Sequence, residues 1–280
     1  MLVSLEITSL PEYEADTIRQ MIEEKTGIHR ECIWVCAAHS FSSPHLLPDG
    51  LLKTEEERRG RDAYRAALQE AACKAATDAL AGLRPAVMGT NAGFCAIVAN
   101  RDVELEDGWW VGTNGDGPTD PTVSVIRFEL EPSHMEIPPR SARRQDDSPM
   151  EVRCAKGESD EASLNFRPED ETNGKEKDIV LISHFAMQSS VLDQYVLPDG
   201  GKVISSDVVG NACRKVEEAY GDGTVAMHLI GAAGDQAPIE KAVIETYSHG
   251  ERSVLVSHED GFAICERLSE KLSKTICELA

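Results

Sequence analysis

Apolar positions along this chain follow two patterns, one typical of β-strands and one typical of α-helices. Strand-like runs, which are short and rich in β-branched residues, occupy residues 2–7, 32–38, 122–128, 179–183 and 224–230. Helix-like stretches, which are periodic or rich in strong helix formers, occupy residues 11–26, 53–83, 207–220 and 259–279. The first strand, helix and second strand predict a β-α-β unit. We therefore expect an α/β fold, a single large domain with a mostly parallel or mixed sheet between helical layers (α/β/α).

Turn-forming residues mark the expected ends of these elements. Three glycines follow helical stretches and are expected to end them: Gly27, Gly82 and Gly221. Asp207, or a serine before it, is expected to begin the third helix as its N-cap. Residues 86–98 are apolar but interrupted by glycine, which predicts short strands joined by a turn. Residues 108–118 are rich in glycine and predict a loop.

Residues 131–178 differ in character from the rest of the chain. They are dense in proline, serine and charged residues and poor in large apolar ones. This composition predicts a polar, disordered insertion, and the alternative is a long connection between two strands of one sheet. Neither flank resembles a complete domain, so we expect one domain spanning residues 1–280 that carries this insertion.

The chain is strongly acidic, with a formal net charge of -21 and a pI of about 4.7. Nucleic-acid binding needs a basic surface, so this charge excludes that class and leaves a small-molecule partner that is cationic, neutral or metal-bound. No run reaches the ~18 apolar residues of a transmembrane segment, and no signal peptide is visible after Met1. The eight cysteines form no CxxC pair, which is typical of reduced thiols. We expect a cytoplasmic protein, and the oligomeric state stays open.

Two histidines, His39 and His184, come directly after strand-like runs. The carboxyl ends of parallel strands meet at one edge of a sheet, so we expect the two side chains to converge. Neutral imidazole is a common zinc ligand, and a catalytic zinc usually has three protein ligands. Asp207 and Asp235 are the candidate carboxylates for the third position. A structural role for each histidine is the alternative.

Three further features allow a functional and a structural interpretation. Arg101, beside Asn100, is suited to bind an oxyanion or carboxylate, or to form a surface salt bridge. The glycines from Gly231 to Gly234 form either a tight turn or a phosphate-binding loop, although they lack the Lys-Ser/Thr of a P-loop. Trp109 and Trp110 are expected either to line a pocket or to pack in the core.

The order of these motifs resembles that of the neutral/alkaline, non-lysosomal ceramidase family, in its N-terminal catalytic domain. The likeness is greatest to the short bacterial ceramidase-like members, and it spans roughly residues 1–130 and 179–240. The matching segments, in the family's order, are His39 to Pro44, Asn100 with Arg101, Asp116 to Phe128, His184, Ser206 to Gly210, and Gly234 to Pro238. Each match is short, and the specificity comes from their common order.

In that family a zinc ion and a serine cooperate in hydrolysing the amide of an N-acyl sphingosine. The resemblance implies that His39 and His184 are zinc (Zn2+) ligands and that Arg101 helps to hold the reacting group. Two positions depart from the family pattern. Its active-site serine matches Ala237, and the second histidine of its first motif matches Phe41.

The leading hypothesis is a zinc-dependent, hydrolase-like protein of this superfamily that cleaves an amide or related bond. Because Ala237 has no hydroxyl, hydrolysis would rely on metal-bound water, with Asp235 or Asp207 as ligand or base. The alternative is a non-catalytic metal- or small-molecule-binding protein on the same scaffold. A third hypothesis is an enzyme that acts on a polar substrate, such as a sugar or an amino-acid derivative. We do not expect true ceramidase activity, because no apolar stretch indicates a site for two long acyl chains.

Overall fold

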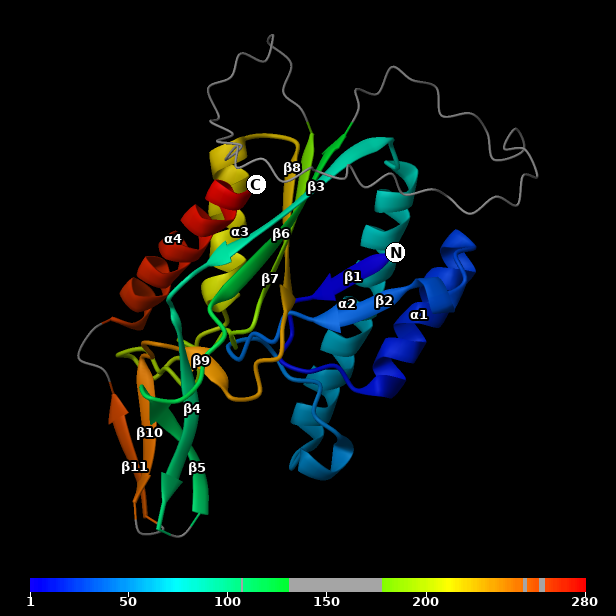
Figure 1. The fold of residues 1–280 in the computed structure, drawn as a ribbon. Coiled ribbons are helices and arrows are strands. Elements are labelled where there is room, and N and C mark those ends of the chain that lie inside the picture. The colour runs from blue at the N-terminus through cyan, green and yellow to red at the C-terminus, as the bar shows by residue number, and fades with distance from the viewer. Residues whose placement is uncertain (107, 131–177, 249–250, 257–259) are drawn as a thin grey trace, which may run out of the picture.

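The computed structural model describes residues 1–106, 108–130, 178–248, 251–256 and 260–280 of the chain (Figure 1). The predicted insertion at 131–178 lies outside these residues, except for Asp178. The helices are α1 (Glu12–Thr26), α2 (Glu55–Ala81), α3 (Asp207–Tyr220) and α4 (Gly261–Leu279). The strands are β1 (Leu2–Leu5), β2 (Trp34–Ala37), β3 (Ala86–Phe94), β4 (Val98–Leu105), β5 (Gly108–Asn114), β6 (Thr122–Leu130), β7 (Ile179–Phe185), β8 (Thr224–Ile230), β9 (Gln236–Pro238), β10 (Val243–Ser248) and β11 (Glu251–Val256).

A four-stranded mixed sheet in the order β3-β6-β7-β8 forms the centre of the fold. β7 and β8 are parallel, whereas β6 is antiparallel to both of its neighbours, β3 and β7. One face of this sheet packs against α3 and α4, as Figure 1 shows, and Phe185 and Leu268 belong to the buried cluster between them. Each fully buried side chain of this size contributes roughly 1.5–3 kcal/mol of stability.

The N-terminal part forms the predicted β-α-β unit. β1 and β2 pair in parallel, and α1 connects them. α1 and α2 pack beside this pair, in a second buried cluster that includes Ile18, Ile22 and Cys73. Gly27 ends α1 with a φ of 71°, a left-handed conformation that favours glycine.

The prediction of a mixed α/β fold is therefore confirmed. The predicted α/β/α arrangement, with a mostly parallel sheet between two helical layers, is not clearly present. Most of the strand pairing is antiparallel, and α1 and α2 pack with β1 and β2 rather than forming an evident second layer on the central sheet. β7 and β8, which α3 connects, are the one parallel pair of the described central sheet, as expected for a β-α-β crossover. β6 pairs antiparallel with both β3 and β7.

Two short sheets lie at one end of the molecule, at the bottom of Figure 1. β5, β4 and β9 form an antiparallel sheet, and β10 pairs with β11 in a hairpin. The expected loop at 108–118 was wrong over its first part, because residues 108–114 form β5 and pair with β4. The expected break inside 86–98 was also wrong in position, since residues 86–94 form one continuous strand.

Candidate functional site

Segments that are far apart in the sequence lie side by side where β2, β7 and β8 end. The backbone amide of Phe41 donates to the carbonyl of Ser189 at 2.9 Å, which joins the loop after β2 to the loop after β7. The amide of Gln188 donates to the carbonyl of Gln236 at 3.1 Å, which adds β9 to the same array. The predicted convergence of the strand-end loops is therefore present in the backbone.

Arg101 and Asp235 meet at the far side of this array. The Arg101 amide donates to the Asp235 carbonyl at 2.8 Å, and Asn100 Nδ2 donates to Asp235 Oδ2 at 2.9 Å. The Arg101 guanidinium turns toward the β7 loop, where Nη1 donates to Gln188 Oε1 at 3.0 Å. The hydrogen bond to Gln188 thus holds the Arg101 guanidinium in place. Asp235 is partly exposed, and the hydrogen bond from Asn100 orients its carboxylate.

His39 occupies a constrained position at the end of β2. Its φ is 56°, which is uncommon for a residue other than glycine. Its Nδ1 lies 2.5 Å from the carbonyl oxygen of Thr8. Because a carbonyl only accepts, Nδ1 carries the proton, and in the neutral ring Nε2 keeps a free lone pair. A hydrogen bond of this kind is what orients a histidine that binds a metal.

His184 is the penultimate residue of β7 and is exposed. Its imidazole covers Gly231 on the neighbouring loop, where an added Cβ would stand 2.9 Å from Nε2. Hydrogen bonds from Thr122 lower the pKa of nearby Asp120, and His184 adds a smaller electrostatic effect in the same direction. Gly231 therefore leaves the space in which the His184 ring lies.

Asp207, the third predicted ligand, is fully buried at the start of α3. Its carboxylate accepts hydrogen bonds from the amides of Val191, Leu192 and Val208 at 3.1, 2.8 and 2.8 Å. Burial raises the pKa of Asp207, and these amide donors oppose that shift. Over the described ranges, no three His, Cys, Asp or Glu side chains form a group that could hold a metal ion, so His39, His184 and Asp207 do not form one.

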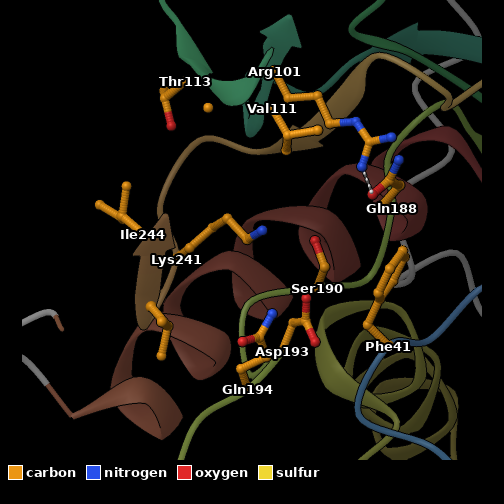
Figure 2. Close-up of a pocket in the computed structure, with 12 residues that line it drawn as sticks. Phe41, Arg101, Val111, Thr113, Gln188, Ser190, Asp193, Gln194, Lys241 and Ile244 are labelled. Atoms are coloured by element: carbon orange, nitrogen blue, oxygen red, sulfur yellow. Dashed lines mark hydrogen bonds between the residues drawn. The ribbon is translucent and has the colours of Figure 1, made fainter. Parts of the chain in front are cut away.

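A pocket of about 80 Å³ lies beside this array (Figure 2). Phe41 and Arg101 line it, together with residues that no sequence motif singled out for this role: Val111, Gly112, Thr113, Gln188, Ser190, Asp193, Gln194, Lys241, Val243 and Ile244. Gln188 is the most connected of these, because its Nε2 also donates to the Ala233 carbonyl at 2.7 Å. In the sequence, only the position of Gln188 four residues after His184 could have pointed to it, and this spacing is weak evidence.

A larger groove of about 620 Å³ adjoins the pocket and shares Phe41, Asp193 and Gln194 with it. Most of its other lining side chains are apolar, and they come from the loops after β2 and β7: Pro44, Leu192, Tyr195, Val196, Val203 and Ile204. Ala237, at the position of the family's serine, is buried in β9 opposite Ala99. The site therefore combines a polar pocket and an apolar groove without a hydroxyl at Ala237.

The mixed sheet, the helices on one face and the converging loops define a ceramidase-like fold. A solved structure described as neutral ceramidase from Pseudomonas aeruginosa matches with a TM-score of 0.60 and 15% identity, over 99% of this chain and 36% of that chain. A second, described as ceramidase complexed with C2, matches with a TM-score of 0.59 and 14% identity, over 99% of this chain and 35% of that chain. No family model and no curated protein sequence matches the chain.

The predicted resemblance to neutral ceramidases is therefore confirmed for the fold. The chain spans about a third of the length of the solved structures it matches. Among the residues with assigned positions, no helix is long and apolar enough to cross a membrane. The seven described cysteines are free thiols.

Proposed function

We propose that this protein is a zinc-dependent hydrolase of amide or related bonds, acting on a small molecule in the cytoplasm. The observation that carries the proposal is the geometry of His39. Its Nδ1 is fixed by the Thr8 carbonyl, which leaves Nε2 as the nitrogen that can bind a metal. The exposed His184 and the ceramidase-like fold support the same interpretation.

The donor chemistry of the two histidines fits zinc, which prefers nitrogen and sulfur ligands. A bound zinc ion would supply a Lewis acid that polarises a carbonyl and makes water more acidic. Because the described residues contain no group of three ligands, a further protein ligand would have to come from outside them. Buried and hydrogen-bonded Asp207 is better suited to hold the loop after β7 than to bind an ion.

Arg101 and Asp235 would act on the substrate in this proposal. Arg101 is held by Gln188 and would orient a substrate oxygen at the pocket. Asp235 is partly exposed, and the hydrogen bond from Asn100 holds its carboxylate in place, so it could accept a proton from water as a general base.

The second candidate is a non-catalytic protein that binds a metal or small molecule on the same scaffold. Ala237 favours it, because the buried methyl group there can neither attack a carbonyl nor relay a proton. Phe41 favours it too. Its ring makes an edge contact with the His39 ring, with the centroids 4.9 Å apart, and it adds no titratable group.

Zinc content tests the proposal first. We expect the purified protein to bind zinc, and the double variant His39→Ala, His184→Ala to lose at least nine-tenths of it, roughly the effect of removing two of three ligands. His29→Ala is the matched control, because its imidazole is 64% exposed on the surface. Absence of zinc from the wild type under zinc-replete conditions would refute the metallohydrolase. Zinc without turnover on a panel of amides and esters would support the second candidate.

Gly231→Ala probes the support of His184 without removing a ligand. The added Cβ would stand 2.9 and 3.0 Å from His184 Nε2 and Cε1 and 3.1 Å from the Ala186 Cα, so the ring and the adjoining backbone must shift. We expect zinc affinity to fall by about 10–100-fold, the usual effect of disturbing groups that orient a ligand. Competition with a chelator measures this affinity. Gly234→Ala is the control, because nothing lies within 4 Å of its added Cβ. Equal affinities for both variants would show that His184 does not bind the metal.

A further inference from the structure

Two buried polar groups in the pocket have no hydrogen-bond partner among the described residues. The Ser190 side chain is 1% exposed, and its Oγ makes no hydrogen bond. Arg101 Nε is buried and also without a partner. Such groups are rare in native proteins because each one costs free energy, and a functional role or a bound water or ion is the kind of explanation that they require. Both groups can donate a hydrogen, so they call for a ligand that accepts.

The charge of the pocket specifies the ligand further. Arg101 and Lys241 bring two positive charges and Asp193 one negative charge, so these lining side chains carry a net positive charge. In Figure 2, Arg101 and Lys241 extend toward the pocket from different parts of the chain, and Ser190 points into the space between them. This local charge stands out in a chain with a formal net charge of -21. The pocket therefore favours an anion although the protein as a whole repels one.

The geometry of the Arg101 guanidinium favours a planar anion. Nη1 is used by Gln188, which leaves the edge formed by Nε and Nη2. That edge matches the two oxygens of a carboxylate in a bidentate pair. The Ser190 hydroxyl can donate to the same group, and Lys241 adds a positive charge.

We infer that this pocket is a carboxylate-binding subsite, and that the substrate class is the N-acyl amino acids. The carboxylate would bind Arg101, Ser190 and Lys241, and the acyl chain would lie in the adjoining groove of about 620 Å³. Phe41 borders both spaces, so a single ligand can occupy them together. The substrate class rests on the proposed amide hydrolysis, whereas the carboxylate subsite does not.

The test uses two amides that share an acyl chain and differ in charge. Binding of N-octanoylglycine and of the neutral N-octanoylethanolamine is measured by calorimetry on the full chain. We expect the acid to bind at least about tenfold tighter, the scale of one hydrogen-bonded charge pair. Lys241→Met and Ser190→Ala are each expected to reduce this preference to less than about threefold. Lys74→Met is the matched control, because it removes a lysine that is 75% exposed on α2 and should keep the preference.

Equal binding of the two amides, or no binding of either, would overturn the inference. A preference that survives both pocket variants would overturn it as well. Turnover of the two amides separates this result from the proposed function. Selective binding of the acid without hydrolysis would refute the hydrolase and keep the carboxylate subsite. Hydrolysis of both amides with equal affinity would keep the hydrolase and refute the subsite.

Discussion

Replacing Asp207 with alanine is expected to lower the free energy of unfolding by roughly 3–5 kcal/mol. The carboxylate is the acceptor for the buried amides of Val191, Leu192 and Val208, and for the hydroxyls of Ser42 and Ser189 at 3.4 Å. Alanine leaves these donors without a partner, and each buried unsatisfied group costs about 1–3 kcal/mol. The midpoint of thermal unfolding should fall by roughly 10 °C.

The backbone conformation of Asp207 also contributes to the stability lost in Asp207→Ala, and a second variant separates this contribution from that of the hydrogen bonds. Its φ is 55°, a conformation that asparagine and aspartate tolerate better than alanine. Asp207→Asn therefore keeps the backbone but replaces one acceptor oxygen with an NH₂ group that faces donors. We expect it to lose less stability than Asp207→Ala, and more than Asp222→Ala, which removes an exposed aspartate beyond the end of α3. Denaturant unfolding measures all three variants, and equal stability of Asp207→Asn and the wild type would contradict the acceptor role.

Asp207 also shows what the sequence could and could not predict. The helix that begins there was predicted, because Val208, Val209, Ala212 and Val216 repeat at helical spacing and are buried in the structure. The role of the carboxylate was not predicted, since its partners at residues 191 and 192 follow no local pattern. A side chain that joins two loops depends on tertiary packing, which composition and periodicity do not encode.

Tertiary contacts also explain why two groups of strands were not predicted correctly from the sequence. Residues 108–114 look like a loop because of their glycines, yet β5 is stabilised by pairing with β4, with Trp110 opposite Val103 and Trp109 opposite Glu104. The hairpin of β10 and β11 was not predicted at all. Strand formation depends on the neighbouring strand more than on intrinsic preference, so short edge strands are the elements that a single sequence predicts least well.

The sequence could indicate the position of a candidate residue where that residue follows a strand end, but not where its position depends on tertiary packing. His39 and Asp235 lie in the converging loops, as the positions of the strand-like runs indicated, and Arg101 lies on β4 beside Asp235. Ser190 and Lys241 follow no motif and reach the pocket only through the folding of their loops. The metal ligand role of His39 and His184 stays a prediction.

The stability of the protein is expected to fall by about 2 kcal/mol between pH 7 and pH 5 because of His228 alone. This histidine lies on β8 and is only 4% exposed. Burial lowers its pKa from 6.5 to about 3, and the nearby His184 adds to the shift. In the unfolded chain His228 takes up a proton below pH 6.5, whereas in the folded chain it stays neutral to about pH 3. Stability present above pH 6.5 is therefore lost as the pH falls toward 3.

Hydrogen bonding explains why the folded protein resists this protonation. His228 Nδ1 lies 2.9 Å from Ser183 Oγ, and the tautomer decides which of the two atoms donates. In the charged ring both nitrogens carry a proton, and Nε2 is buried and has no partner among the described residues. Charging the ring would thus place an unpaired N–H and a positive charge in the interior.

Urea unfolding of wild type and His228→Leu at pH 7 and pH 5 measures this contribution. The variant cannot titrate at this position, so its loss of stability over the same range should be smaller by about 2 kcal/mol, whatever its absolute stability. His29→Ala is the control for loss of an imidazole, because that side chain is 64% exposed rather than buried. If His228→Leu kept the full pH dependence of the wild type, a different group would have to account for the acid sensitivity, and His228 would have to be charged or solvated in the folded protein.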